Sequence, residues 1–282
     1  MTSNIIMRMV AGKRYFGEDD DNEEAKKFRG VMNEVITSTG VLNPADYFPV
    51  FGWIDYKGIE KNLARPEYYT DVVIKGIIVV MLLEGTDTSA VIIEWAMTVL
   101  LKHPEKLDKA RAEVDNLVGN NRLINKSDLS SLPYLQNIIL ETFRLFPVAP
   151  MSLPHESSRD FKLGGYDIPR GTMLLANAWA IQRDPMVWSD DPTSFKPERF
   201  EVGKVGPTKV LQFGMGRRSC PSNGLAQRVV GLGLASLIQC FQWRRIDEAL
   251  VDLIEGEGAI VLSKCVPLEA KCKARDVLLN VL

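Results

Sequence analysis

The chain has 282 residues, a length that suits one large domain or two small ones. Hydrophobic residues make up 46% of it and charged residues 25%, the balance of a globular protein with a substantial core. The formal net charge is −2, so no basic field favours nucleic acid as a partner.

Metal and membrane signals are weak in the composition. The two histidines, His103 and His155, are far apart, and the four cysteines have no zinc or redox spacing. The most apolar run, Gly76 to Leu83, is too short to cross a bilayer, and no signal peptide stands at the start.

The first quarter of the chain predicts helices joined by loops. Residues 22–37 place their apolar side chains on one face, and a loop with two prolines follows at residues 40–51. Another helix begins at Tyr56, but Leu63-Ala64-Arg65 runs almost directly into Pro66.

A long helix is predicted from Pro66 to Leu101, because proline is tolerated in a first turn. Its middle is the run Glu84 to Ser89, in which a glycine is followed by threonines. A threonine hydroxyl competes for a helix carbonyl and can open a local bend. Spacing alone favours an ordinary helix defect over a functional feature.

Two further helices are expected before residue 150. The first starts at Pro104 and would bury Leu107, Ala110, Val114 and Leu117, and residues 119–131 then form a largely polar connection. The second runs from Leu132 to Phe146 and is stopped by Pro147. Glu141 and Arg144 lie three apart on it and can pair, although most such pairs are surface ion pairs.

Short β elements and one more helix complete the prediction. The hairpin 161–168 turns at Gly164-Gly165, since two glycines suit a tight turn. The other expected elements are strands at 172–176, 240–244, 259–262 and 268–273, a short helix at 177–182, and a helix at 224–239 with Leu225, Val229, Leu232 and Ser236 toward the core. The fold class is mainly α with small β-sheets, an α+β arrangement.

The loop Phe213 to Pro221 carries the strongest chemical signal. It places Cys220 after two glycines and two arginines, directly before an apolar helical run. Glycines let backbone approach a bulky ligand, and the arginines favour a thiolate and supply donors for anions. One thiolate with nearby cations is what haem iron and its propionates require. A buried structural cysteine after a glycine-rich turn explains the loop alone equally well.

This loop resembles the haem-binding signature of the cytochrome P-450 monooxygenases at Phe213, Gly216, Arg218 and Cys220. The stretch Phe213 to Gln227 is similar to the plant flavonoid and isoflavone hydroxylase branch. Ser222 departs from the pattern, because the family carries glycine there. The family also has a small residue at the position of Glu84.

The resemblance implies a role for each matched residue. Cys220 would be the axial thiolate ligand of haem iron. Cofactor binding would also involve Phe213, Arg218 and His155, and proton delivery would involve Asp87 and Thr88. A buried structural lock would be formed by Glu141, Arg144 and Arg199. The substrate would be contacted by Val148, Ala149, Met151 and Ser152.

The implied function is a haem-thiolate monooxygenase that hydroxylates a small apolar, flavonoid-like substrate. It would use dioxygen and electrons from an NADPH-dependent reductase. Full-length members are held to the endoplasmic reticulum membrane, and the missing anchor leaves it open that this chain is soluble. Residues 1–282 are expected to form the C-terminal part of the catalytic domain, without the N-terminal half and with an internal deletion near residues 64–65. The alternative is a catalytically inactive fragment or splice product of such an enzyme.

Overall fold

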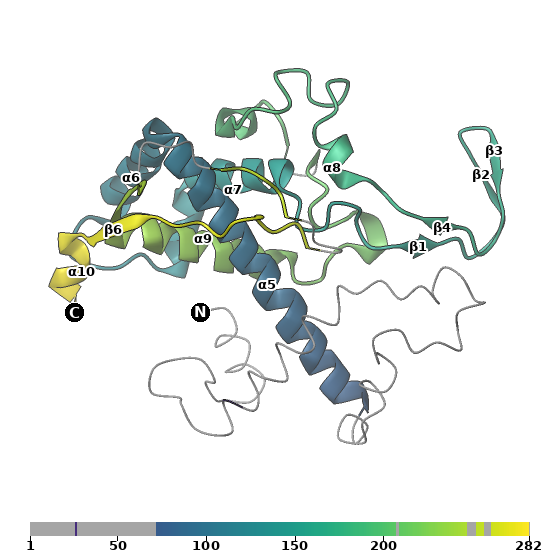
Figure 1. Cartoon of the computed structure of the whole chain (residues 1–282), viewed down its shortest axis with the longest axis horizontal. Coiled ribbons are helices and arrows are strands. Elements are labelled where there is room, and N and C mark those ends of the chain that lie inside the picture. The colour runs from purple at the N-terminus through teal and green to yellow at the C-terminus, as the bar shows by residue number, and fades with distance from the viewer. Residues whose placement is uncertain (1–25, 27–71, 207–208, 247–251, 257–260, 282) are drawn as a thin grey trace. The chain divides into compact units, whose positions relative to one another are not determined.

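A computed structural model describes residues 26, 72–206, 209–246, 252–256 and 261–281 (Figure 1). The helices expected within residues 22–63, the deletion near 64–65 and the start of the helix at Pro66 lie outside this described part. The chain divides into two compact units at Ala90–Val91.

Four α-helices of more than ten residues dominate the described part, which confirms the mainly α prediction with small sheets. They are α5 (Val72–Lys102), α6 (Pro104–Val118), α7 (Pro133–Leu145) and α9 (Asn223–Cys240). The short helices are α8 (Ala178–Ile181), α10 (Asp276–Val281), and the 3-10 turns η4 (Lys126–Ser131), η5 (Pro197–Phe200) and η7 (Gly216–Arg218). None of the helices in the described ranges is long and apolar enough to span a membrane.

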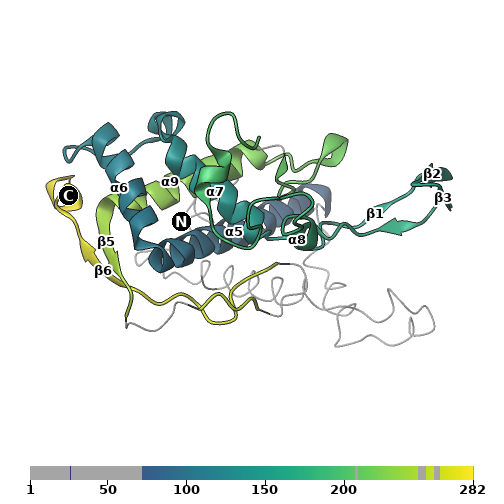
Figure 2. The same ribbon diagram turned by 90° about the horizontal axis from the view of Figure 1, so that it is seen from above.

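The core of the second unit lies among the end of α5, α6, α7 and α9 (Figures 1 and 2). Trp95 is fully buried and stacks on Phe146 with ring centroids 4.1 Å apart and planes 7° apart. Its indole N–H donates to the carbonyl of Leu262 at 3.0 Å, so the C-terminal segment is tied to α5. In α9, a Cβ on Gly233 would meet Cδ1 of Ile93 at 3.0 Å, so the glycine permits the close approach of α9 to α5.

Two predicted helix faces are shifted. In α6 the buried residues are Leu107, Ala110, Val114 and Val118, and Leu117 is exposed because the spacing of four continues to the helix end. In α9 the predicted Leu225, Val229, Leu232 and Ser236 are half-buried, and the fully buried aliphatic residues are Val230, Leu234, Ala235 and Ile238. This helix is apolar on most sides, so periodicity alone could not select the face that α5 and α7 cover.

Within the residues that the structure describes, the sheets are three two-stranded antiparallel ladders. The predicted hairpin is confirmed as β2 (Phe161–Leu163) and β3 (Tyr166–Ile168), with φ of +58° and +90° at its two turn glycines. The pair β1 (His155–Glu156) and β4 (Met173–Leu174) leads to it, and Figures 1 and 2 show this ribbon reaching out from the helices.

The C-terminal ladder pairs β5 (Phe241–Arg244) with β6 (Lys271–Ala274). Val261 and Leu262 are not in a strand, and residues 259–260 lie outside the described part, so the expected strand at 259–262 is wrong over its described half. The segment instead forms an isolated bridge between Glu255 and Lys264. The expected polar connection at 119–131 contains η4, where Asn125 and Asp128 form a capping box that the sequence analysis did not predict.

Candidate functional site

The Cys220 loop is a closed turn at the start of α9. The backbone N–H of Cys220 donates to the carbonyl of Phe213 at 2.8 Å, which joins the two ends of the loop. Gly214 and Gly216 have φ of +68° and +71°, a region that other residues rarely adopt. The Cys220 side chain is exposed and makes no disulfide. The loop therefore presents a free thiol rather than the buried structural cysteine of the alternative interpretation.

The two arginines of the loop have no ion-pair partner among the described residues. Arg217 and Arg218 are exposed, and no carboxylate in the described part of the chain forms an ion pair with either. Ser222, where a glycine was expected, has φ −89° and ψ 6°, so a side chain is accommodated there without backbone strain. Phe213 is half-buried and packs edge-on against Phe143, with ring centroids 5.2 Å apart.

A buried ion cluster joins α7 to η5. Arg144 donates from Nε and Nη2 to the two oxygens of Glu141, at 2.7 and 2.8 Å. Arg199 of η5 donates from Nε to Glu141 Oε1 at 3.2 Å, and the backbone N–H of Lys196 donates to the same oxygen at 2.9 Å. The carboxylate and the Arg144 guanidinium are fully buried, so this cluster is a desolvated network and not a surface pair.

Arg144 also holds the meander that leads to the loop. Its Nη1 donates to the carbonyls of Gln182 and Pro192 at 2.7 and 2.6 Å, and its Nη2 donates to that of Ser194 at 3.3 Å. Every donor on this planar group is thereby directed at a fixed acceptor, which sets the path of residues 182–199 over α7.

Gln182 is a structural residue that the sequence did not reveal. Its side chain is fully buried, and its Nε2 donates to the carbonyls of Phe143 and Arg144 at 3.3 and 3.1 Å. Its Oε1 accepts the backbone N–H of Leu211 at 2.8 Å. Gln182 thus ties the end of α7 to the residues just before Phe213.

Gln182→Met is expected to destabilise the chain by about 1–3 kcal/mol, because two buried carbonyls and the half-buried N–H of Leu211 lose their partner. Gln227→Met is the matched control, since Gln227 is exposed on α9 and its side chain bonds, among the described residues, only that of Asn223. Equilibrium denaturation measures both. An equal, small effect of the two variants would contradict the bridging role of Gln182.

The run Glu84 to Ser89 lies in the first unit, within continuous helix. The hydroxyl of Thr88 donates to the carbonyl of Glu84 at 2.5 Å, and that of Ser89 to the carbonyl of Gly85 at 3.2 Å. Thr86 Oγ1 is buried and has no partner in the described part. Glu84 is exposed, and burial raises the pKa of the Asp87 carboxyl above its usual range.

Asp87→Asn should change how stability depends on pH. The folded chain holds the Asp87 proton to higher pH than the unfolded chain, so ionisation of this group disfavours folding as pH rises through the raised pKa. Wild type should therefore lose stability as pH rises from the ordinary aspartate pKa to the raised pKa, and Asp87→Asn should not. The unfolding free energy of the variant minus that of wild type should increase with pH over this range. Urea denaturation at a series of pH values measures this difference, and a constant difference would count against a buried Asp87 carboxyl.

The residues assigned to substrate follow α7 on one continuous segment. Val148 is buried, its N–H donates to the side-chain oxygen of Gln212 at 3.1 Å, and its carbonyl accepts the N–H of Leu262 at 2.8 Å. Ala149 and Ser152 are half-buried and Met151 is exposed, with Ser152 at φ +54°. His155 is exposed on β1 opposite Leu174, so its side chain is free to reach a ligand.

Comparison with known proteins identifies the family. The family model for cytochrome P-450 matches residues 53–264, which take in the Cys220 loop, the Glu141 cluster and the Asp87 run. The chain belongs to the cytochrome P-450 family.

Plant cytochromes P-450 are among its most similar relatives. Cytochrome P-450 81Q32 of Catharanthus roseus is 53% identical over an alignment of 317 positions, which covers 100% of this chain and 63% of that protein. An isoflavone 2'-hydroxylase of Glycyrrhiza echinata is 44% identical, over 100% of this chain and 64% of that protein. An isoflavone 3'-hydroxylase of Medicago truncatula is 44% identical, over 98% of this chain and 63% of that protein.

The chain thus spans a little under two thirds of the length of these cytochromes P-450. A solved structure of a zebrafish cytochrome P-450 with abiraterone superposes with a TM-score of 0.75 and 26% identity, over 97% of this chain and 70% of that one. The mainly α prediction with small sheets is therefore the fold of this family.

The residues present suit the haem of a cytochrome P-450. A thiol that is exposed, bonded to no other cysteine and carried on a turn with two positive-φ glycines suits an axial sulfur ligand. Arg217 and Arg218 beside it are cations without an ion-pair partner in the described ranges, as propionate carboxylates require. No cluster of three or more His, Cys, Asp or Glu side chains suited to another metal occurs among the described residues.

Proposed function

We propose that this chain carries the catalytic part of a haem-thiolate monooxygenase that hydroxylates a small apolar, flavonoid-like substrate. The observation that supports it most is the exposed thiol of Cys220 in its closed glycine turn, inside the region that the family model matches. When bound, the haem would supply dioxygen activation, and electrons would come from an NADPH-dependent reductase.

The chain's own residues would bind the haem and hold the Cys220 turn in position. Cys220 would bind the iron, and the backbone of its turn would keep the sulfur in place, because Phe213 and Cys220 are joined by a hydrogen bond. Arg218 and His155 would bind propionates. Glu141, Arg144 and Arg199 would hold the meander that leads into the turn.

Proton delivery is assigned to Asp87 and Thr88. A carboxyl whose pKa is raised by burial holds its proton nearer neutral pH, as a proton donor requires. The hydroxyl proton of Thr88 is engaged by the carbonyl of Glu84, so Thr88 would have to release that bond to pass a proton on.

The substrate class comes from the relatives. Two of them are named isoflavone hydroxylases, which act on flat aromatic molecules. Val148, Ala149, Met151 and Ser152 would contribute to the pocket for such a molecule. A location at the endoplasmic reticulum membrane, as for full-length members, is part of the same proposal.

Turnover tests the proposal directly. The full chain, expressed with haem supply, is mixed with a plant NADPH-dependent reductase, an isoflavone and isotopically heavy dioxygen. A product that gains one heavy oxygen atom supports the monooxygenase, provided that Cys220→Ala forms none. Full haem loading with no product would favour the inactive alternative.

A further inference from the structure

The buried indole of Trp95 links α5 to the segment that follows α7. Its ring stacks on Phe146, the residue after α7, with the two planes 7° apart. Its N–H donates to the carbonyl of Leu262 at 3.0 Å, and the N–H of Leu262 donates to the carbonyl of Val148 at 2.8 Å. One side chain therefore holds the residue before Pro147 by stacking and the residue after it through Leu262.

Val148 is the fixed end of a more open segment. Both of its backbone groups are engaged, since its N–H donates to Gln212 Oε1 at 3.1 Å and its carbonyl is the acceptor in the link to α5. The side chains that follow are accessible, because Ala149 and Ser152 are half-buried and Met151 is 42% exposed. The place of these side chains thus depends on where the backbone of Val148 is held.

The same part of α5 fastens the C-terminal segment at two further points. Glu94 Oε1 accepts the N–H of Leu268 at 2.7 Å. Lys264 is only 8% exposed, and its Nζ lies 5.1 Å from the centroid of the Trp95 ring. Two consecutive residues of α5 thus fix the segment that carries Leu262, and all of these contacts lie within the second unit.

We propose that Trp95 is a positioning residue for the substrate, which it serves by setting the place of residues 149–152 through Leu262 and Val148. This inference rests on the proposed function, in which those residues contribute to the substrate pocket. Trp95 is fully buried, so it acts through these backbone links and not by contact with substrate. Such links matter because displacing a substrate-positioning group by about 1 Å can cost about 100-fold in rate.

Trp95→Phe tests the proposal, because phenylalanine keeps a ring against Phe146 but has no N–H for Leu262. The dissociation constant of the isoflavone daidzein, measured by equilibrium dialysis against the haem-loaded full chain, should rise about tenfold. Haem content and the carbon monoxide spectrum should stay as in wild type. Hydrogen–deuterium exchange, which needs no haem, should become faster in peptides that cover residues 148–152 and 261–264.

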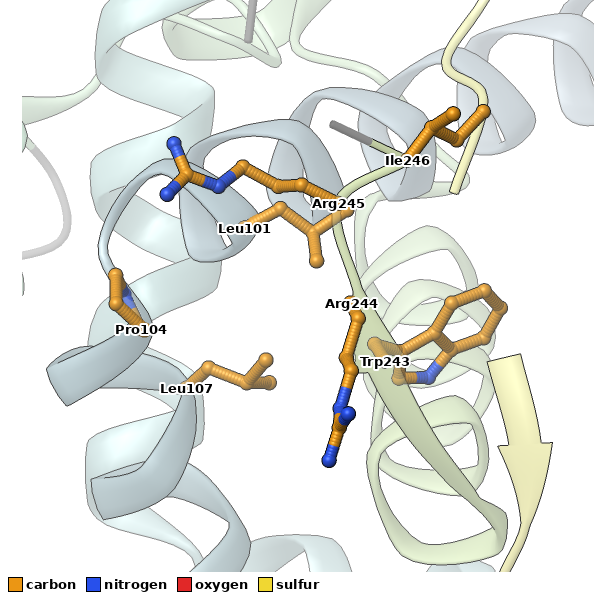
Figure 3. Close-up of a pocket in the computed structure, with 7 residues that line it drawn as sticks. All are labelled: Leu101, Pro104, Leu107, Trp243, Arg244, Arg245 and Ile246. Carbon is orange, nitrogen blue, oxygen red and sulfur yellow. The ribbon is translucent and has the colours of Figure 1, made fainter. Parts of the chain in front are cut away.

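Trp243→Phe is the matched control, since it removes the same kind of bond elsewhere. Trp243 is half-buried on β5, and its indole N–H donates to the carbonyl of Leu237 at 2.8 Å. It lines a hollow beside Leu101 and Pro104 (Figure 3). Both variants should lose stability, but Trp243→Phe should leave daidzein affinity and exchange at residues 148–152 unchanged, which separates positioning from packing.

A pair of substitutions at the half-buried Glu94 decides the matter if Trp95→Phe does not fold. Glu94→Met removes the acceptor of the Leu268 N–H and should weaken daidzein binding, and Glu94→Gln, which keeps an oxygen acceptor, should restore it.

The two proposals fail in different ways. Unchanged daidzein affinity and unchanged exchange in Trp95→Phe, beside a wild type that binds daidzein, would overturn the positioning role and leave the proposed function standing. A wild type that takes up no haem or binds no daidzein would refute the proposed function, and the positioning role with it.

Discussion

Cys220→Ala is expected to abolish haem ligation through sulfur. The variant should lose the thiolate-type optical spectrum entirely, because the Phe213–Pro221 turn contains no second cysteine to supply a thiolate. The fold should survive, since the Cys220 side chain is exposed and packs in no core. Haem content after reconstitution and the spectrum of the ferric form measure the change, and circular dichroism checks the fold.

The chain offers two matched controls for this substitution. Cys265 and Cys272 are also exposed and free, but they lie in the C-terminal segment. Cys265→Ala and Cys272→Ala should keep the wild-type haem spectrum. A Cys220→Ala protein with an unchanged spectrum, or a loss that Cys265→Ala reproduces, would contradict the assignment of Cys220 as ligand.

Glu141→Gln is expected to cost about 3–5 kcal/mol of stability, because it leaves buried guanidinium charge without a counterion. Arg144 is fully buried, and the substitution keeps the shape of the side chain while removing the charge that both Arg144 and Arg199 face. Urea denaturation measures the loss. Since Arg144 also holds the meander before the turn, haem uptake should fall in the same variant.

Glu201→Gln provides the comparison for an exposed pair. Glu201 lies 2.8 Å from Lys204, and both side chains are about half exposed. Its loss should cost less than about 1 kcal/mol, as for other surface ion pairs. If Glu141→Gln cost no more than Glu201→Gln, the cluster would not be the structural lock that the resemblance implies.

The sequence predicted those parts of the fold that depend on neighbours along the chain. The hairpin at 161–168 follows from two adjacent glycines, and α7 follows from its apolar spacing and the proline after it. The pairing of Glu141 with Arg144 follows from a spacing of three on one helix. Local chemistry was sufficient for each of these elements.

Other features depend on contacts that no local pattern encodes. Gln182 satisfies backbone groups of residues 143, 144 and 211, and such partners are visible only once the meander is folded over α7. The buried face of α9 was misplaced because its apolar residues surround the helix, and the packing partners choose among them. The open thiol of Cys220 could likewise not be told from a buried one by sequence spacing.

The proposed function requires that this chain hold haem iron through the sulfur of Cys220. The most direct measurement is the spectrum of the full chain, purified after expression with haem supply, reduced and exposed to carbon monoxide. We predict the red-shifted Soret band that marks a thiolate ligand. Absence of haem from the folded chain, or an unshifted band typical of a nitrogen ligand, would contradict the account.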